Sequence, residues 1–253
     1  MRPLLEICVD TPAGLRAAAA NGADRIELCA ALSEGGLTPS CGFMQRARGG
    51  GVPVRAMIRP RAGDFTYDDA ELAVMRDDIA AAAEAGLAGV VFGANLADGA
   101  LDTDALADLS RRARESGLET ALHRGFDLAP DPFAALDDAI ALGFDTVLTS
   151  GAAQSAPEGA AVLQALVARA AGRIEILAGG GVRAGNAALL LNAGLRALHA
   201  SCRAPLPLRA THVGAAQLGS ALQNYVTPDL RDTAAAEVRA LRDRMNAFSG
   251  EPA

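Results

Sequence analysis

Short apolar segments alternate with longer alanine-rich segments along almost the whole chain. Each apolar segment has the length of a buried strand, and each intervening segment has the periodicity of an amphipathic helix. The pattern predicts strands at residues 4–9, 24–29, 53–59, 88–93, 118–123, 145–150, 173–178 and 196–201. It predicts helices at residues 11–21, 39–48, 69–85, 103–116, 132–142, 157–171, 184–193 and 232–248.

Eight strands that are each followed by a helix favour a closed parallel (β/α)8 barrel, or TIM barrel, as a single α/β domain over residues 1–253. A glycine that ends a helix just before a strand recurs at intervals of two strand–helix units, which agrees with this architecture. A doubly wound open sheet is the alternative. The segment 204–231 is too long for a simple turn, so we expect it to lie over the C-terminal mouth of the barrel.

The period-two pattern decides which strand residues face the barrel interior. In the first strand, Leu5, Ile7 and Val9 share one side, while Glu6 and Cys8 share the other. Since the side that packs against the helices must be apolar, the glutamate and the cysteine point inward.

The same test directs further polar and ionisable side chains into the interior from other strands. A barrel interior is usually filled by branched apolar side chains, and buried charges cost several kcal/mol unless they are paired. We therefore interpret the inward set as a functional site. Its members are Glu6, Cys8, Glu27, Cys29, Arg55, Met57, Arg59, His123, His199 and Ser201.

Structural roles are the alternative for part of this set. Glu6 is also consistent with an internal ion pair to Arg55 or Arg59. Cys8 and Cys29 are consistent with small buried fillers, since free cysteine is among the most buried residue types.

The loops after the strands place more charge and several glycines at the predicted mouth. The loop after the third strand, IRPRAGDFTYDD, places Arg59, Arg61 and Asp64 at the mouth, and HRGFD follows the fifth strand. Three glycines in LAGGGV expose backbone N–H groups, which suit an anion. These loop residues are Arg59, Arg61, Asp64, Arg124, Asp127, Gly179, Gly180 and Gly181.

Composition excludes several classes of protein. All 23 basic residues are arginine, so Schiff-base chemistry through a lysine, including that of pyridoxal phosphate (PLP), is excluded. A net charge of −7 and 4% aromatic residues argue against nucleic-acid and anionic membrane partners. No apolar run reaches the ~18 residues that span a bilayer. Four cysteines do not indicate a disulfide framework, and no secretory signal is evident, so we expect a cytoplasmic protein.

The series LEICVD, GADRIELC, GGLTPS, MIRPRAGDFTY, VFGA, HRGFD, VLTSG, AGGGV and LHAS resembles the CutC family, whose members are described as copper homeostasis proteins. The resemblance covers about residues 4–203. It implies a cytosolic TIM barrel that commonly self-associates, for example as a dimer, and that handles copper, including Cu(I) bound by cysteines. Gly125 and Ala152 depart from the family's usual alanine and glycine. The recurring polar positions of the family fall here on Glu6, Cys8, Glu27, Cys29, Arg59, Arg61, Asp64, His123, Arg124 and Asp127.

Two functions follow from these residues. Cu(I) prefers thiolates, and Cys8 and Cys29 lie on neighbouring strands ~4.8 Å apart, so copper binding through these cysteines is the first hypothesis. The second is an acid–base isomerase or lyase that needs no lysine and acts on a small anionic substrate, for example a phosphorylated one. Its predicted catalytic residues are Glu6, Glu27, His123 and Asp127. Its predicted substrate-binding residues are Arg59, Arg61, Asp64, Arg124, Gly179, Gly180, Gly181, His199 and Ser201.

Overall fold

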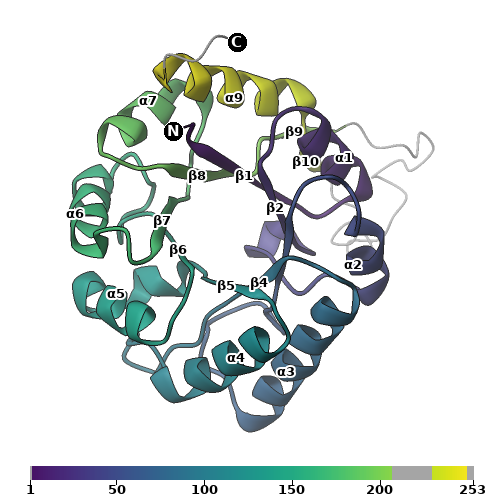
Figure 1. Cartoon of the computed structure of the whole chain (residues 1–253), viewed down its shortest axis with the longest axis vertical. Coiled ribbons are helices and arrows are strands. Elements are labelled where there is room, and N and C mark those ends of the chain that lie inside the picture. Colours follow the sequence, from purple (N-terminus) through teal and green to yellow (C-terminus); the bar gives the residue numbers. More distant parts are fainter. Residues whose placement is uncertain (1, 207–229, 250–253) are drawn as a thin grey trace, which may run out of the picture.

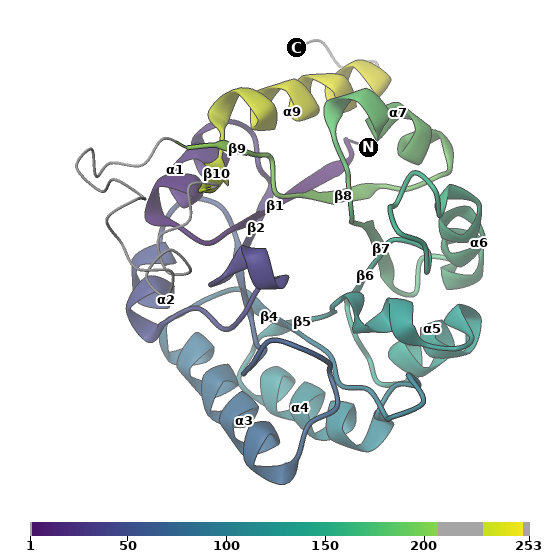
Figure 2. The ribbon, with the colours of Figure 1, turned by 180° about the vertical axis from the view of Figure 1, so that it is seen from behind.

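Eight parallel strands close into a barrel in the order of the sequence, as predicted. The structure is a computed structural model that describes residues 2–206 and 230–249. Figures 1 and 2 look down the barrel from its two ends. The barrel strands are β1 (Leu4–Val9), β2 (Arg25–Leu28), β3 (Val54–Met57), β4 (Gly89–Phe92), β5 (Glu119–Leu122), β6 (Thr146–Thr149), β7 (Glu175–Ala178) and β8 (Ala197–Ala200).

Helices form the outer ring around these strands (Figure 1). Several begin at side-chain caps that the sequence supplies; Asp68 and Glu71, for example, form a capping box at the start of α3. The short helix η1 (Leu32–Glu34) follows β2, and η2 (Arg124–Leu128) follows β5. The ring consists of α1 (Pro12–Ala20), α2 (Cys41–Ala47), α3 (Asp69–Glu84), α4 (Thr103–Glu115), α5 (Pro132–Ala141), α6 (Ala160–Ala170), α7 (Ala184–Asn192) and α9 (Ala235–Ser249).

The predicted division between outward and inward strand residues is confirmed. The apolar side of β1, which comprises Leu5, Ile7 and Val9, belongs to the large core between the strands and the helices. Cys8 belongs instead to a separate small cluster with Cys29, which directly follows β2, with Met57 on β3 and with parts of β4 and β5. The strand pattern therefore separates one apolar layer outside the sheet from a second, more polar interior.

The chain after β8 differs from the prediction in detail. Residues Arg203–Pro205 form β9, which pairs antiparallel with β10, Arg231–Thr233. The last helix consequently begins at Ala235 and not at residue 232. Residues 207–229, on which most of the predicted mouth-covering segment falls, lie outside the described residues. No helix within the described ranges is long and apolar enough to cross a membrane.

Ion pairs fill the lower half of the barrel interior, toward the N-terminal ends of the strands. The guanidinium of Arg25 pairs with Glu6 on β1 and with Glu175 on β7. Arg55 on β3 pairs with Glu119 on β5, at 2.8 Å. Each buried arginine here therefore has at least one carboxylate partner, which offsets the cost of its burial.

Candidate functional site

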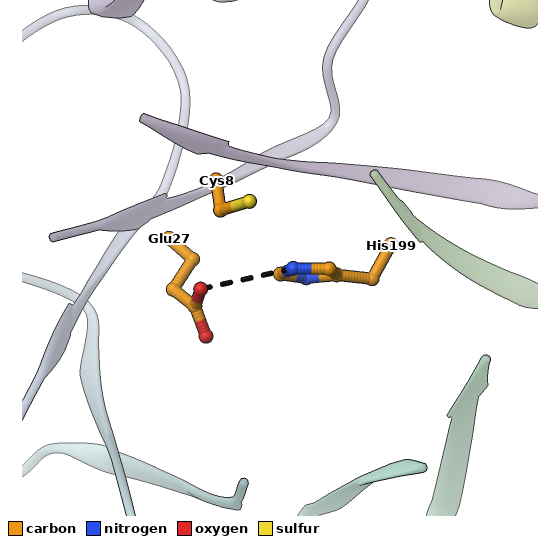
Figure 3. Close-up of side chains that lie close together, drawn as sticks. All are labelled: Cys8, Glu27 and His199. Carbon is orange, nitrogen blue, oxygen red and sulfur yellow. Dashed lines mark ion pairs between the residues drawn. The ribbon is translucent and has the colours of Figure 1, made fainter. Parts of the chain in front are cut away.

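The register of three neighbouring strands brings four predicted site residues together. Glu6 on β1 lies opposite His199 on β8, and Cys8 on β1 lies opposite Glu27 on β2. Glu6 contacts His199 and Arg25 inside the barrel, and Figure 3 shows Cys8, Glu27 and His199 converging. One donor atom from each of these three residues lies within 4.8 Å of the other two. They form the one group of this kind, with three or more such donors, in the described part of the chain.

Glu6 fixes the imidazole ring of His199 from below. A Glu6 carboxylate oxygen lies 2.8 Å from Nδ1 of the ring, and Arg25 binds the other oxygen. Burial favours the neutral acid, but the hydrogen bond with His199 and the charge of Arg25 outweigh burial and lower the pKa of Glu6 to about 2. Glu6 is therefore a carboxylate at neutral pH, and the ring presents Nε2 to the mouth.

Glu27 is buried with less compensation. Burial and the charge of Glu6 raise its pKa above the ordinary value, although His199 acts in the opposite direction. Oε2 accepts a hydrogen bond from Cys29 Sγ at 3.4 Å and lies 3.7 Å from Nε2 of His199. Oε1 has no hydrogen-bond partner among the described residues, which is uncommon for a buried carboxylate.

The pKa of His199 is raised well above its ordinary value. Burial disfavours the charged ring, but Cys8 and Glu27 nearby outweigh that effect. The pKa of the Cys29 thiol is also raised, by burial and by the charge of Glu27. The site is thus a small set of groups whose protonation states depend on one another.

Cys29 is not part of the three-residue group, although the sequence places it on the same face as Cys8. The register explains this, because Cys8 pairs with Glu27 and Cys29 follows two residues later. Two residues of a parallel strand rise about 6.6 Å, so Cys29 lies closer to the mouth than Cys8. Its hydrogen bond to Glu27 connects it to the group from above.

A cavity of about 930 Å³ opens above the group at the C-terminal ends of the strands. This is the end at which TIM barrels bind ligands. The ends of β9 and β10 also line it, through Ala204, Pro205 and Arg231. Of the predicted site residues, Cys8, Glu27, Arg59, His123, Arg124, Gly180, Gly181, His199 and Ser201 line the cavity.

His123 contributes a buried polar edge to this cavity. Its Nδ1 accepts a hydrogen bond from the backbone N–H of Gly125 at 3.0 Å. Burial, with the positive charge of Arg59, lowers the pKa of His123 to about 4. The neutral ring therefore carries its proton on Nε2, and that N–H has no partner among the described residues.

The other predicted residues lie outside the cavity lining. Arg61 and Asp64 form an exposed ion pair, and Arg61 also pairs with Glu71 at the start of α3. Gly179 continues β7 by donating to the carbonyl of Thr149, and a Cβ there would lie 2.5 Å from Leu148. Close packing is therefore the reason for a glycine at that position.

Asp127 has a supporting position beside the cavity. Its carboxylate accepts hydrogen bonds from the backbone N–H groups of Ser150 and Ala152 and from Arg124 Nε. It therefore fixes the loop after β6 and the Arg124 side chain at the same time.

Sequence reasoning missed three residues of this region. Arg25 shares a strand side with Glu27, so the period-two pattern already directed it inward, but no role was assigned to it. The same pattern in β7 would have directed Glu175 inward as its partner. Phe65, whose ring centroid lies 4.4 Å from that of His123, is in a loop, where periodicity gives no signal.

Comparisons with known proteins agree with this architecture. The sequence model of the CutC family matches residues 3–204. A CutC family protein of Sinorhizobium medicae is 49% identical over 250 residues, which cover 99% of both chains. One of Caulobacter vibrioides is 51% identical over 237 residues, 94% of both chains.

A solved structure extends the comparison to three dimensions. A chain of Streptococcus agalactiae that is described as a copper homeostasis protein, CutC, is 34% identical in sequence and has a TM-score of 0.75. The match covers 79% of this chain and 98% of that chain. Family model, full-length relatives and barrel structure all agree, so the chain belongs to the CutC family.

Proposed function

We propose that the protein binds a copper ion through Cys8 Sγ, the Glu27 carboxylate and His199 Nε2. The observation that carries this proposal is the convergence of one donor atom from each residue to within 4.8 Å at the floor of the cavity. The copper homeostasis name of the Streptococcus agalactiae relative supports the choice of metal.

The donor set fits a transition metal by its chemistry. Thiolate and imidazole ligands suit copper and zinc, and a carboxylate completes a three-ligand set with room for an external ligand. Oε1 of Glu27 has no hydrogen-bond partner among the described residues, so its lone pairs are available to a bound cation. This mixed set differs from the two-thiolate Cu(I) site that the sequence alone indicated, and Cys29 supports it as a hydrogen-bond donor to Glu27.

Residues below the donors hold the histidine as metal-binding proteins usually do. A ligating histidine commonly hydrogen-bonds a carboxylate through its other ring nitrogen, which fixes the tautomer and the ring orientation. Glu6 occupies that position, and Arg25 holds Glu6. A copper ion bound there would supply a Lewis acid and a redox centre to the cavity floor.

Competition titration tests this proposal. The reduced chain is titrated with Cu(I) against a chelator of known affinity, and separately with Zn²⁺. We expect one ion per chain, with an affinity that falls at least about tenfold in Cys8→Ser and in His199→Gln. Cys41→Ser is the matched control, because Cys41 is an exposed free thiol on α2. Binding that survives both site substitutions, or that Cys41→Ser abolishes, would overturn the proposal.

We propose an acid–base isomerase or lyase as the second candidate function, because the cavity is far larger than a metal ion. Its volume of about 930 Å³ is that of a small-molecule site. Glu27 and His123 line the cavity and would exchange protons with a substrate, while Glu6 and Asp127 would hold their neighbours in position.

Proton exchange tests the second candidate without a known substrate. The protein is incubated in D₂O with a panel of small 2-oxo acids and phosphorylated ketoses, and loss of C–H signals is followed by NMR. Exchange that depends on Glu27, and is therefore lost in Glu27→Gln, is the expected result. Equal exchange in both proteins, or none with any member of the panel, would contradict an acid–base role.

A further inference from the structure

Arginines outnumber glutamates among the residues that line the mouth cavity, although the chain as a whole carries −7. Three glutamates line it, Glu27, Glu34 and Glu237. Two of the lining arginines, Arg124 and Arg203, pair with the carboxylates of Asp127 and Asp10. The lining includes five arginines: Arg59, Arg124, Arg183, Arg203 and Arg231.

Arg59 is a buried cation without a carboxylate partner in the described part of the chain. Its side chain lies at the end of β3, and the residue is 5% exposed. The guanidinium donates to the carbonyl oxygens of Glu34, Gly36 and Gly63 and lies over the ring of Phe65. Its Nε has no hydrogen-bond partner among the described residues. A buried charge is normally compensated, so an anionic group in the cavity would supply the missing compensation.

Two side-chain hydrogen bonds position Arg124, which follows β5, at the cavity. Its Nε donates to Asp127 and its Nη2 donates to Ser150 Oγ, each at 2.8 Å. These two bonds direct Nη1 toward the glycine turn after β7, where a Cβ on Gly180 would lie 3.2 Å from it. A guanidinium fixed in this way is pre-organised to bind an oxyanion.

The glycine turn itself offers backbone donors. Gly180 and Gly181 have φ angles of +100° and +72°, which favour glycine. Their carbonyl oxygens accept from Ala156 N–H and Asn186 Nδ2, whereas their own N–H groups have no acceptor in the described residues. The turn leads into α7, and residues from Gly180 to Ala184 line the cavity. Free N–H groups that precede a helix N-terminus bind phosphate in many proteins.

His123 is an independent sign of a missing ligand. The residue is 3% exposed and lines the cavity, and its Nε2–H donor is unpartnered. A buried donor without an acceptor destabilises the folded chain, and a bound oxygen acceptor would remove this cost.

We propose that the cavity binds a small organic phosphate, whose phosphate group lies between the Arg124 guanidinium and the N–H groups of Gly180 and Gly181. Arg59 and His123 face the remainder of the ligand. This phosphate subsite rests on the second candidate function, the acid–base enzyme, and specifies the chemical class of its substrate. It uses none of the three proposed metal ligands, so it does not depend on copper binding.

Calorimetric titration of the metal-free full chain with inorganic phosphate and with glycerol 3-phosphate tests the subsite. We expect both to bind, and Arg124→Gln to weaken them by about 10-fold or more, the worth of a charge-assisted hydrogen bond. Arg124→Lys, which keeps the charge but loses the fork of donors, should weaken binding less. Arg169→Gln is the control, since Arg169 lies in an exposed ion pair with Asp137.

The outcomes separate this proposal from the other two. Phosphate should bind Cys8→Ser as it binds the parent chain, and copper should bind Arg124→Gln as it binds the parent chain. Equal affinity of Arg124→Gln and Arg169→Gln for phosphate would overturn the subsite, as would the absence of any binding. Titration with malonate distinguishes the anion, because tighter binding of the dicarboxylate would overturn the assignment to phosphates. Binding is measured directly, so a negative proton-exchange assay leaves this result unaffected.

Discussion

The lower and upper halves of the barrel interior contain the same kinds of charged residue, but these residues differ in whether they have ion-pair partners. In the lower half, Arg25 pairs with Glu6 and Glu175, and Arg55 pairs with Glu119. Each of these arginines has a carboxylate partner, which is how a protein tolerates buried charge, although Arg55 Nε has no hydrogen-bond partner among the described residues. They stabilise the barrel and offer little to a ligand.

In the upper half, buried polar atoms are left without partners among the described residues. These atoms are Glu27 Oε1, Arg59 Nε and His123 Nε2, and all three residues line the cavity. Residue type alone therefore does not identify a ligand-binding site inside this barrel. The carboxylate partners of the buried arginines distinguish the structural half from the half that we propose to be functional, since Arg25 and Arg55 have such partners and Arg59 has none among the described residues. Glu6 belongs to both halves, since it connects Arg25 below to His199 above.

The largest effect on stability is expected in the lower half. Arg25→Met would remove the buried cation that Glu6 and Glu175 share, so we expect it to lower the free energy of unfolding by about 3–5 kcal/mol. Urea denaturation measures this. Arg169→Met removes an exposed pair and should cost about 1 kcal/mol or less. Equal losses of unfolding free energy in the two variants would show that the buried ion pairs stabilise the barrel no more than an exposed pair does.

The next effect is a pH dependence that arises in the upper half. The pKa of His123 is about 4 when folded, against an ordinary value of 6.5, because of burial and the charge of Arg59. The unfolded chain therefore binds a proton that the folded chain does not, and stability is lost as the pH falls from about 6.5 to about 4. The loss attributable to this residue is about 3 kcal/mol.

Comparison with His123→Gln isolates this contribution. Unfolding is measured in urea at pH 7 and at pH 4 for both proteins, so that the many other titrating groups cancel. The parent chain should lose more stability than the variant between these pH values. Parallel losses would mean that the ring is not held neutral.

Glu27→Gln is expected to have a smaller effect, and to raise the stability of the folded chain where the preceding changes lower it. The pKa of Glu27 is raised by burial, so its charge destabilises the folded chain above its ordinary pKa, and this cost grows as the pH rises. The variant should be more stable than the parent at pH 8, by about 1 kcal/mol, while it loses metal affinity. Thermal unfolding at pH 5 and pH 8 checks the sign. A clear loss of stability at pH 8 would show that Glu27 is satisfied in the way that Glu6 is.

The smallest effects are expected at the exposed pair beside the mouth. Arg61→Gln removes ion pairs with Asp64 and Glu71, outside the cavity lining. We expect a stability change of about 1 kcal/mol or less and no change in copper or phosphate affinity. Any loss of either affinity, measured by the same titrations, would extend the site to this loop.

Much of the barrel could be predicted from the sequence because it depends on local rules. The alternation of strands and helices predicted the closed barrel, and period two predicted the inward direction of Glu6, Cys8, Glu27 and His199. These features need only the polarity of each residue and its place in a strand.

The composition of the site depends on register and on loop paths, which local rules do not determine. Cys29 shares a face with Cys8, but the pairing of Cys8 with Glu27 moves it out of the three-residue group. Arg59 and Arg61 are two residues apart, yet Arg59 lines the cavity and Arg61 lies in exposed ion pairs. A period of two describes a strand and does not continue through the loop that follows it.

X-ray absorption at the copper edge of the reduced, stoichiometrically loaded protein identifies the atoms that bind the ion. A site formed by Cys8, Glu27 and His199 predicts one sulfur scatterer together with nitrogen or oxygen scatterers, including the outer-shell signature of imidazole. The sulfur should disappear in Cys8→Ser, and the imidazole signature should disappear in His199→Gln. Two sulfur scatterers without imidazole would contradict the three-residue site, because the ion would then be held by a thiol pair and not by the three groups at the cavity floor.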